Sequence, residues 1–284
     1  MKRRITSALL IVAMLVLMLP TAAFASFSDI NGHWAQAKIE NWSEKGIIQG
    51  AGGQFRPNSP ITRGEMAVIL DRIMKYQVKA ANTFYDLDQS WYTEAILKAN
   101  AAGIILGSNN YVRPKDNITR EEAVVILGRA LGLNEITATK ELKFKDASQI
   151  SDWAVGYVNA LTEKGFVKGD LNGNFNPKAN ITRAEVVTIL DNSIKELYTK
   201  AGEYSDKVIE GNVIINTPSV TLRNMKINGD LIIAEGVGEG EVTLDNIEIS
   251  GNAIVKGGGE QSVYFNSVTV GGALVVNKTD GKLR

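Results

Sequence analysis

Three arginines in equivalent positions are the residues of this chain best placed to bind a charged ligand. They are Arg63, Arg120 and Arg183, and each follows a threonine that stands three residues before a glutamate. A threonine and a glutamate at this spacing form a capping box, which starts a helix by accepting hydrogen bonds from two backbone N–H groups. A cation in the first turn opposes the helix dipole, so the capping box leaves the arginine unexplained. An arginine fork beside free amide hydrogens favours binding of a carboxylate, and a salt bridge to a neighbouring aspartate is the alternative.

Three other sets of residues recur beside the arginines and are predicted to line the same binding sites. An aspartate can accept hydrogen bonds from sugar hydroxyls, or it can cap the turn before the first helix or pair with an arginine. A tryptophan can stack on a sugar ring, although its recurrence at a helix start favours a core position. A glycine can serve a turn or let a ligand approach the backbone. These residues are Asp29, Asp86 and Asp146; Trp34, Trp91 and Trp153; and Gly50, Gly107 and Gly169.

All of these residues belong to a unit that occurs three times. The first two units are offset by 57 residues, as from Phe27 to Phe84, and the third follows after 60 to 63 residues, as from Phe84 to Phe144 and from Ile118 to Ile181. Each unit is predicted to form a helix that ends at a pair of glycines, a loop, and a second helix that begins at the Thr-Arg pair. A fixed period of this kind is the signature of a repeat architecture.

The second helix of each unit carries an apolar stripe with the spacing of a buried helix face. The stripes are Met66, Ile69, Leu70 and Ile73; Ala123, Ile126, Leu127 and Ala130; and Val186, Ile189 and Leu190. A unit this small cannot bury its own apolar face. The three units are therefore predicted to share one core around a pseudo-threefold axis.

The first residues of the chain have the pattern of a secretory signal peptide. A basic start, Met1 to Arg4, precedes an apolar run from Ala8 to Leu19 and the cleavage pattern Ala23-Phe24-Ala25. The apolar run has 12 residues, which is short for a membrane span of about 20 residues. We predict cleavage before Ser26, with an uncleaved anchor as the alternative.

Composition excludes several other classes of function. The 284 residues contain 31 lysines and arginines and 31 aspartates and glutamates, so no overall positive charge points to nucleic acid. The chain has no cysteine, which excludes disulfides and thiolate metal sites. We predict no cofactor and no metal ion.

A second repeat begins after about Gly202 and has the pattern of short strands. Asparagines recur at steps of 22 and 20 residues, at Asn224, Asn246 and Asn266, each followed by a glycine and a short β-branched run. That length fits one coil of a parallel β-solenoid. The asparagines are predicted to form a ladder from rung to rung, with exposed turn asparagines as the alternative.

The Phe-x-Asp, Gly-x-x-x-Gly and Ile-Thr-Arg-x-Glu motifs recur in that order three times between Phe27 and Tyr198. In this the segment resembles the S-layer homology family. The resemblance implies docking to a secondary cell-wall polysaccharide, often one with pyruvyl-ketal N-acetylmannosamine, in grooves between neighbouring repeats. It assigns groove roles to the three arginines and to the second glycine of each pair. The family's alanine after the arginine is Gly64 in the first unit and Glu121 in the second, and the charge of Glu121 is expected to weaken its groove.

We therefore predict a multidomain protein: a mainly all-α, pseudo-threefold domain of three helix-loop-helix repeats, followed by a short parallel β-solenoid. The expected boundaries are a signal peptide at 1–25, repeats at 26–80, 81–140 and 141–200, and the solenoid at 201–284. The predicted function is non-covalent anchoring of an exported protein in the cell wall or S-layer of a Gram-positive bacterium. The predicted partner is an acidic, pyruvylated secondary cell-wall polysaccharide, and the solenoid is a spacer or assembly module.

Two other functions compete with this prediction. A β-helix lyase or hydrolase carrying a wall anchor would need a carboxylate pair or a calcium cluster, whereas the acidic residues after Gly202 are scattered; we predict that the chain is not an enzyme. An outer-membrane protein would need many strands of about 10 residues. The open end of the solenoid is an unpaired edge, so self-association or a partner is expected there. Neither nucleic acid nor, after removal of the signal peptide, a membrane is an expected partner.

Overall fold

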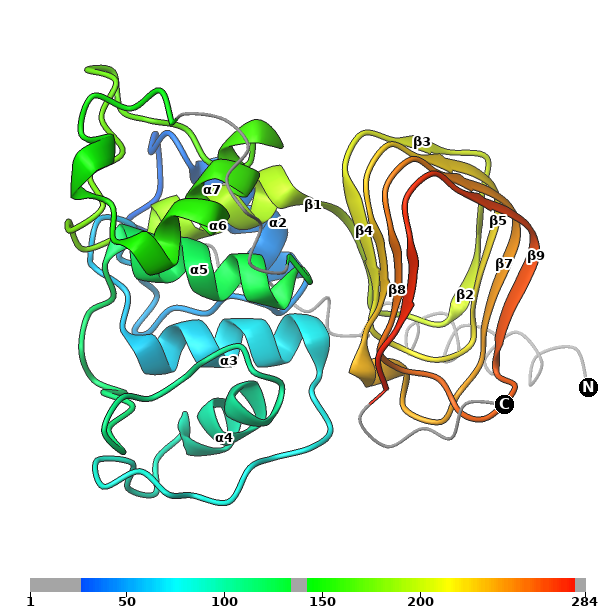
Figure 1. The fold of residues 1–284 in the computed structure, drawn as a ribbon, viewed down its shortest axis with the longest axis horizontal. Helices are drawn as coiled ribbons and strands as arrows, with labels where there is room; N and C mark the ends of the chain where they lie inside the picture. Colours follow the sequence, from blue (N-terminus) through cyan, green and yellow to red (C-terminus); the bar gives the residue numbers. More distant parts are fainter. Residues whose placement is uncertain (1–26, 134–141, 279–284) are drawn as a thin grey trace, which may run out of the picture.

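The computed structural model describes residues 27–133 and 142–278, and the predicted signal peptide lies outside this range. Helices occupy the first part of the chain and a parallel β-solenoid occupies the second, as predicted (Figure 1). In the part of the chain that the structure describes, no helix is long and apolar enough to cross a membrane.

Each repeat contributes two helices, which confirms the predicted helix-loop-helix units. The pairs are α2 (Gln36–Glu44) and α3 (Arg63–Met74), α4 (Thr93–Ala101) and α5 (Arg120–Ala130), and α6 (Asp152–Glu163) and α7 (Arg183–Ser193). A 3-10 turn, η1 (Ala147–Gln149), precedes α6. The first helix of each pair ends at a glycine with a φ of 72° to 74°, a left-handed conformation that glycine adopts without steric cost.

The second helix of each repeat begins with the predicted capping box. In α3 the Thr62 amide donates to Glu65 Oε2 over 2.9 Å, and the Glu65 amide donates to Thr62 Oγ1 over 3.2 Å. The same reciprocal pair opens α5 and α7. The threonine and the glutamate therefore have the structural role that their spacing indicated.

Thr119→Ala is expected to lower the free energy of unfolding by about 1 kcal/mol, because the Glu122 amide loses its acceptor. Urea denaturation followed by circular dichroism measures the change. Thr243→Ala serves as the control, since Thr243 lies in a solenoid strand and caps no helix. A midpoint of the Thr119 variant equal to that of the wild type would contradict the capping role.

The three repeats close into a ring through a triangle of backbone hydrogen bonds. The Ile61 amide donates to the Ile181 carbonyl, Ile181 donates to Ile118, and Ile118 donates to Ile61, each over 3.1 Å. The three residues stand at the same position of their repeats, immediately before the capping threonine. This cyclic pattern confirms the pseudo-threefold arrangement.

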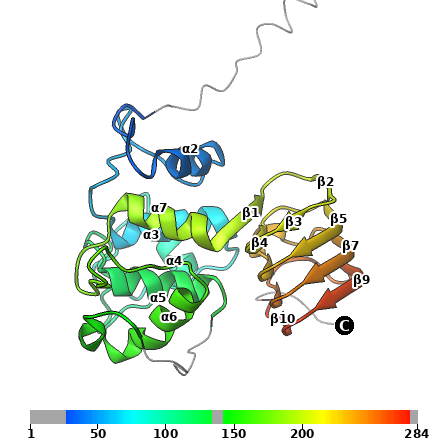
Figure 2. The same cartoon turned by 90° about the horizontal axis from the view of Figure 1, so that it is seen from above.

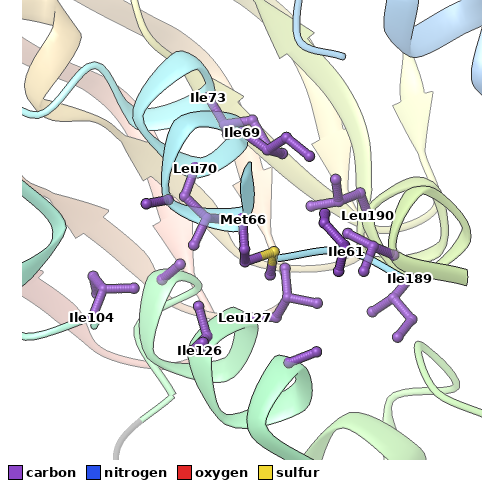
Figure 3. Close-up of a cluster of buried hydrophobic side chains, with 14 of the residues drawn as sticks. Ile61, Met66, Ile69, Leu70, Ile73, Ile104, Ile126, Leu127, Ile189 and Leu190 are labelled. Carbon is purple, nitrogen blue, oxygen red and sulfur yellow. The ribbon is translucent and has the colours of Figure 1, made fainter. Parts of the chain in front are cut away.

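The helices interlock across repeat boundaries. Helix α4 packs on α3, α6 packs on α5, and α2 returns to pack on α7, so each first helix covers the second helix of another repeat. The predicted apolar stripes meet inside the ring and are buried (Figure 3). Ser193, which interrupts the third stripe, is also buried and donates its hydroxyl to the Ile189 carbonyl over 2.7 Å.

The solenoid consists of two parallel sheets whose strands stack rung on rung. One sheet has the order β1 (Ile194–Tyr198), β4 (Asn212–Ile215), β6 (Leu231–Ile233), β8 (Ala253–Val255) and β10 (Leu274–Val276). The other has the order β2 (Gly202–Ser205), β5 (Val220–Ile227), β7 (Val242–Ile249) and β9 (Val263–Val270), with β3 (Val208–Ile209) also paired to β5. A 3-10 turn, η2 (Glu235–Val237), follows β6.

The predicted asparagine ladder is shorter than expected, and one of its members is different. Asn246 Nδ2 donates to Asn224 Oδ1 over 2.8 Å, and both residues are exposed with left-handed φ values of 56° and 51°. The register pairs Asp245 with Asn266 and Ile247 with Val268. Ser267, with a φ of 54°, therefore occupies the equivalent corner instead of Asn266. The prediction for Asn266 was wrong by one residue, because the left-handed corner rather than the residue type defines the rung.

A second ladder, which the sequence had not indicated, lies inside the protein. Asn212 Oδ1 accepts the Asp230 amide over 2.8 Å, Asp230 Oδ1 accepts the Asn252 amide over 2.7 Å, and Asn252 Oδ1 accepts the Ala273 amide over 2.9 Å. Asn212 and Asp230 are each 2% exposed. Each side chain thus satisfies the first amide of the next rung, where an unpaired group would be costly.

The helical domain and the solenoid share one apolar cluster. Strand β1 follows α7 without a linker (Figure 2), so the solenoid begins at Ile194, ahead of the boundary predicted at 201. Ile214, Ile232 and Ile254, one from each of three stacked strands, are buried in the helical core. Asn216 is also buried and donates to the Ile73 carbonyl at the end of α3 over 2.8 Å.

Candidate functional site

The three arginines occupy the boundaries between repeats, each in contact with the capping box of another repeat. Arg63 pairs with Glu122, Arg120 with Glu185, and Arg183 with Glu65, at Nη1–Oε1 distances of 3.4, 3.0 and 2.7 Å. Each arginine also donates through Nη2 to a carbonyl in the repeat of its glutamate partner, the one just before the second glycine: Leu106 for Arg63, Lys168 for Arg120 and Gln49 for Arg183. The arginines thus fasten the ring of repeats.

These contacts correct the reason for expecting a free arginine. The carboxylate partner is the capping glutamate of another repeat and not an aspartate. The first amides of each second helix are also occupied: in α7 the Arg183 and Ala184 amides donate to the Ser59 and Pro57 carbonyls, each over 3.0 Å. The same pattern holds in α3 and α5. A ligand would therefore meet side chains at these helix N-termini and not free amides.

Arg183 is the most fully held of the three. Its Nε donates to the Phe55 carbonyl over 2.9 Å, and its guanidinium lies 4.6 Å from the centroid of the Phe55 ring. Burial lowers the pKa of Arg183, and Glu65 opposes this shift. Its three hydrogen bonds use one N–H of each guanidinium nitrogen, so within the described residues two of the five N–H groups remain for a ligand.

The aspartates hold the loop between the two helices of each repeat. Asp29 accepts the Phe55 and Arg56 amides over 2.8 and 2.7 Å, so both carboxylate oxygens are occupied. Asp86 and Asp146 make the same pair of bonds in the second and third repeats. Burial alone would raise the pKa of Asp29. The hydrogen bonds from the two amides outweigh this effect, so the pKa of Asp29 lies below its ordinary value. The carboxylates thus cap this loop between the two helices, and not the turn before the first helix.

The second glycine of each pair is confined by an aromatic ring. A Cβ on Gly50 would lie 2.6 Å from a Phe27 ring carbon, and a Cβ on Gly107 would lie 2.4 Å from the equivalent carbon of Phe84. Gly169 faces Phe144 in the same way, at 3.0 Å. Close packing thus requires glycine at these positions, and Gly50 also lines the groove described below.

The tryptophans are exposed, so the favoured core position was wrong. Trp34, Trp91 and Trp153 have exposed fractions of 63%, 65% and 51%. The residue that follows each tryptophan is buried in the core instead. Tyr92, for example, packs against Gly64. A large apolar side chain that is exposed at the same place in three repeats indicates a binding surface.

Groove 1 brings residues of all three repeats around one cavity of about 340 Å³. Repeat 1 forms its walls, Arg183 comes from repeat 3, and Trp91 comes from repeat 2. Arg56 and Arg72 also line it, and Glu65 is its one acidic residue. Groove 1 therefore combines three cations with an exposed indole.

Groove 2 repeats this composition one boundary further on, with a cavity of about 240 Å³. Arg63 comes from repeat 1, Arg113 from repeat 2 and Trp153 from repeat 3. Three acidic residues line it as well: Asp116, Glu121 and Glu122. Glu121 is buried and binds the Ser151 amide and the Lys178 ammonium, which balance its charge.

Arg56 and Arg72 are groove residues that the sequence had not singled out. Arg56 has a left-handed φ of 59°, and Arg113 in the second repeat has one of 53°. Arg72 donates to the Ile47 carbonyl over 3.0 Å and to Gln49 Oε1 over 2.7 Å. An arginine precedes both Pro57 and Pro114, and this recurrence could have identified Arg56 and Arg113 from the sequence. Among the described residues, no cluster of histidine, aspartate and glutamate has the arrangement of a metal site.

Comparison with known proteins adds a family to this geometry. A model of the S-layer homology domain matches residues 26–67, 83–124 and 143–187. Each matched segment contains one Phe-x-Asp motif and one capping box with its arginine. The three matches therefore coincide with the three repeats that form the ring.

Several longer proteins are similar to this chain. An amylopullulanase of Thermoanaerobacterium thermosulfurigenes is 36% identical over 173 residues, 58% of this chain and 9% of that protein. An S-layer protein of Bacillus thuringiensis subsp. finitimus is 27% identical over 239 residues, 81% of this chain and 29% of that protein. A cellulosome-anchoring protein of Acetivibrio thermocellus is 31% identical over 152 residues, 51% of this chain and 34% of that protein. The chain spans about a third or less of the length of these relatives. The three domain matches and the stacked parallel strands together show that the chain is an S-layer homology domain protein with three tandem repeats and a parallel β-solenoid.

Proposed function

We propose that the three repeats anchor this chain non-covalently at a bacterial cell surface by binding an acidic cell-wall polysaccharide. The observation that carries the proposal is groove 1, where three arginines and an exposed tryptophan border one cavity. An S-layer protein and a cellulosome-anchoring protein among the relatives support a location at the cell surface. The signal-peptide pattern of residues 1–25 supports export.

The chemistry of groove 1 fits a sugar that carries a carboxylate. An indole face packs against the apolar face of a sugar ring, and a guanidinium fork pairs with a planar carboxylate. Glu65 and the Gln49 carbonyl hold the Arg183 fork in place, so its remaining N–H groups need little ordering when a ligand arrives. A pyruvyl ketal on an amino sugar would present such a carboxylate.

The balance of charge ranks groove 1 above groove 2. Groove 1 has three arginines and one glutamate in its lining, whereas groove 2 has two arginines and two acidic residues besides Glu121, whose charge Lys178 balances. In the third repeat, asparagines replace two of the groove 1 arginines: Asn176 stands at the position of Arg56, and Asn192 stands at the position of Arg72. We therefore expect most of the affinity for an acidic polymer to come from groove 1.

The solenoid fits the role of a rigid spacer. It continues from α7 without a linker and buries three isoleucines in the helical core. Its orientation relative to the grooves is therefore fixed by packing and not by a flexible segment. This supports a role in holding other structures at a set distance from the wall.

Sedimentation with wall sacculi tests the anchoring proposal directly. The purified full-length chain without its signal peptide should sediment with sacculi, and extraction of the wall polysaccharide should abolish this. Sedimentation that survives the extraction would refute the polysaccharide as the partner.

Trp91→Ala is expected to weaken binding to sacculi about tenfold, because the apolar area that the indole buries against the sugar, roughly 1.5–3 kcal/mol for a large side chain, is lost. The melting temperature should stay unchanged, since the side chain is 65% exposed. Tyr264→Ala is the matched control: Tyr264 is an exposed aromatic on the solenoid, away from the grooves. Equal binding by both variants would remove Trp91 from the site.

A further inference from the structure

A second cavity, which we call the lysine pocket, lies where the helical domain meets the first solenoid coil. It has a volume of about 430 Å³ and is lined by residues at the ends of α2 and α3, by Lys98 of α4 and by Thr199 after β1. Its cationic side chains are Lys45, Arg72, Lys75 and Lys98. Arg72 also lines groove 1, so the two cavities adjoin.

The lysine pocket remains cationic after its negative groups are counted. Asp71 is the one acidic residue in its lining, and it pairs with Lys98 at 3.5 Å. The C-terminal ends of α2 and α3 border the pocket and carry roughly half a negative charge each. These groups offset about two of the four positive charges. The surplus favours an anion.

The ring of repeats supplies two internal comparisons for this pocket. At the second boundary, between α5 and α6, small residues occupy the positions equivalent to Lys45, Lys75 and Lys98; they are Ala102, Gly132 and Ala160. At the third boundary, lysines return but are engaged: Lys164 pairs with Asp230 at 3.2 Å, and Lys195 donates to the Asp191 carbonyl over 2.8 Å. The fold therefore does not require free lysines at this place.

Three groups of the lysine pocket lack a partner in the described residues. The Lys75 ammonium makes no hydrogen bond or ion pair, whereas the Lys45 ammonium binds the Asn41 amide oxygen. The Tyr76 hydroxyl is buried without a partner, and Asp71 Oδ1 is likewise buried and unpaired. An unpaired buried polar group costs roughly 1–3 kcal/mol, so a ligand that reaches these groups recovers part of that cost.

We propose that the lysine pocket binds the phosphate group of a hydroxyl-bearing phosphate ester. Lysine ammonium groups act as compact point charges, which suit a tetrahedral phosphate, whereas the arginine forks of groove 1 suit a planar carboxylate. The phosphate lies against Lys45, Lys75 and Lys98, and a hydroxyl of the ester donates to Asp71. The ester is either a unit of a wall polymer or a small soluble molecule.

Titration of the full-length chain with glycerol 3-phosphate, followed by calorimetry, tests the site. Saturable binding is expected, with none for uncharged glycerol. Lys75→Gln should raise the dissociation constant about tenfold at an unchanged melting temperature, because Lys75 makes no ion pair to lose. Lys195→Gln, at the equivalent position of the third repeat, should leave it unchanged. Absence of saturable binding, or equal binding by the Lys75 variant and the wild type, would overturn the proposal.

Two further measurements identify the source of the phosphate and separate this site from groove 1. If a wall polymer supplies the phosphate, Lys75→Gln also weakens sedimentation with sacculi; unchanged sedimentation, together with the loss of glycerol 3-phosphate binding, assigns the site to a soluble ester. Trp91→Ala should retain the wild-type affinity for glycerol 3-phosphate, because Trp91 lines groove 1 and not the lysine pocket. A parallel loss in the Trp91 variant would show that glycerol 3-phosphate binds in groove 1, and the lysine pocket would be excluded.

Discussion

Arg183→Ala is expected to lower the free energy of unfolding by about 2–3 kcal/mol and to abolish binding in groove 1. The substitution leaves Glu65 and the Phe55 and Gln49 carbonyls without their donor, and it removes the cation above the Phe55 ring. Removal of one partner from a buried ion pair costs roughly 3–5 kcal/mol. The side chain of Glu65 is 28% exposed, so water recovers part of this cost. Urea denaturation and sedimentation with sacculi measure the two effects.

Arg113→Ala provides the matched control for the effect on stability. Arg113 also pairs with a capping glutamate, at 3.3 Å from Glu122, but its side chain is 52% exposed. Exposed pairs contribute roughly 0.2–1 kcal/mol, so a much smaller loss is expected. If both arginine variants unfold at the wild-type urea concentration, the arginines do not fasten the ring.

Asp230→Ala is expected to destabilise the protein by about 2–4 kcal/mol. The partly buried Asn252 amide loses its acceptor, and Lys164 loses the ion pair that joins α6 to the solenoid. A buried donor left unpaired costs roughly 1–3 kcal/mol, and a hydrogen bond to a charged group contributes roughly 1.5–3 kcal/mol. Asp230→Asn should recover part of the loss, because its amide oxygen can still accept from Asn252. Urea denaturation of the full-length chain compares the variants.

Asn246→Gly tests the exposed ladder under the same conditions and should cost less than about 1 kcal/mol. Glycine removes the side chain without strain at the φ of 56° found at this position. Its bond to Asn224 is exposed, so water replaces it. A larger effect for Asn246→Gly than for Asp230→Ala would mean that the exposed ladder and not the buried one holds the coils together.

The sequence predicted the features that depend on residues close together in the chain. The capping box of Thr62 and Glu65 spans three residues, so its spacing alone specifies its geometry. The burial of Met66 and Leu70 follows from helical periodicity in the same way. Repetition then multiplied each local signal by three.

Features that depend on contacts between distant repeats were not predictable in the same way. Arg183 and Glu65 are 118 residues apart, and nothing in their local sequence indicates that they meet. The exposure of Trp91 was also missed, because both tryptophan and the following Tyr92 suit a core and periodicity cannot decide between neighbours. Closure of the ring makes that choice.

The buried ladder of the solenoid shows a different limit. Asn212, Asp230 and Asn252 occupy one position of successive coils but are not identical residues, so a search for a recurring residue type overlooks them. Their shared property is a side-chain oxygen that accepts the next backbone amide. Asparagine and aspartate are interchangeable in that respect.

Helix α7 carries Arg183 at its first residue, and strand β1 begins immediately after its last. At 1.5 Å per residue its 11 residues span about 16 Å. A pulling force on the solenoid therefore reaches the arginine of groove 1 along this short rod, with no slack segment to stretch first, while the packed isoleucines carry the rest of the force into the helical core. Under load, the contact between Arg183 and Glu65 thus bears part of the tension between the solenoid and the ring of repeats.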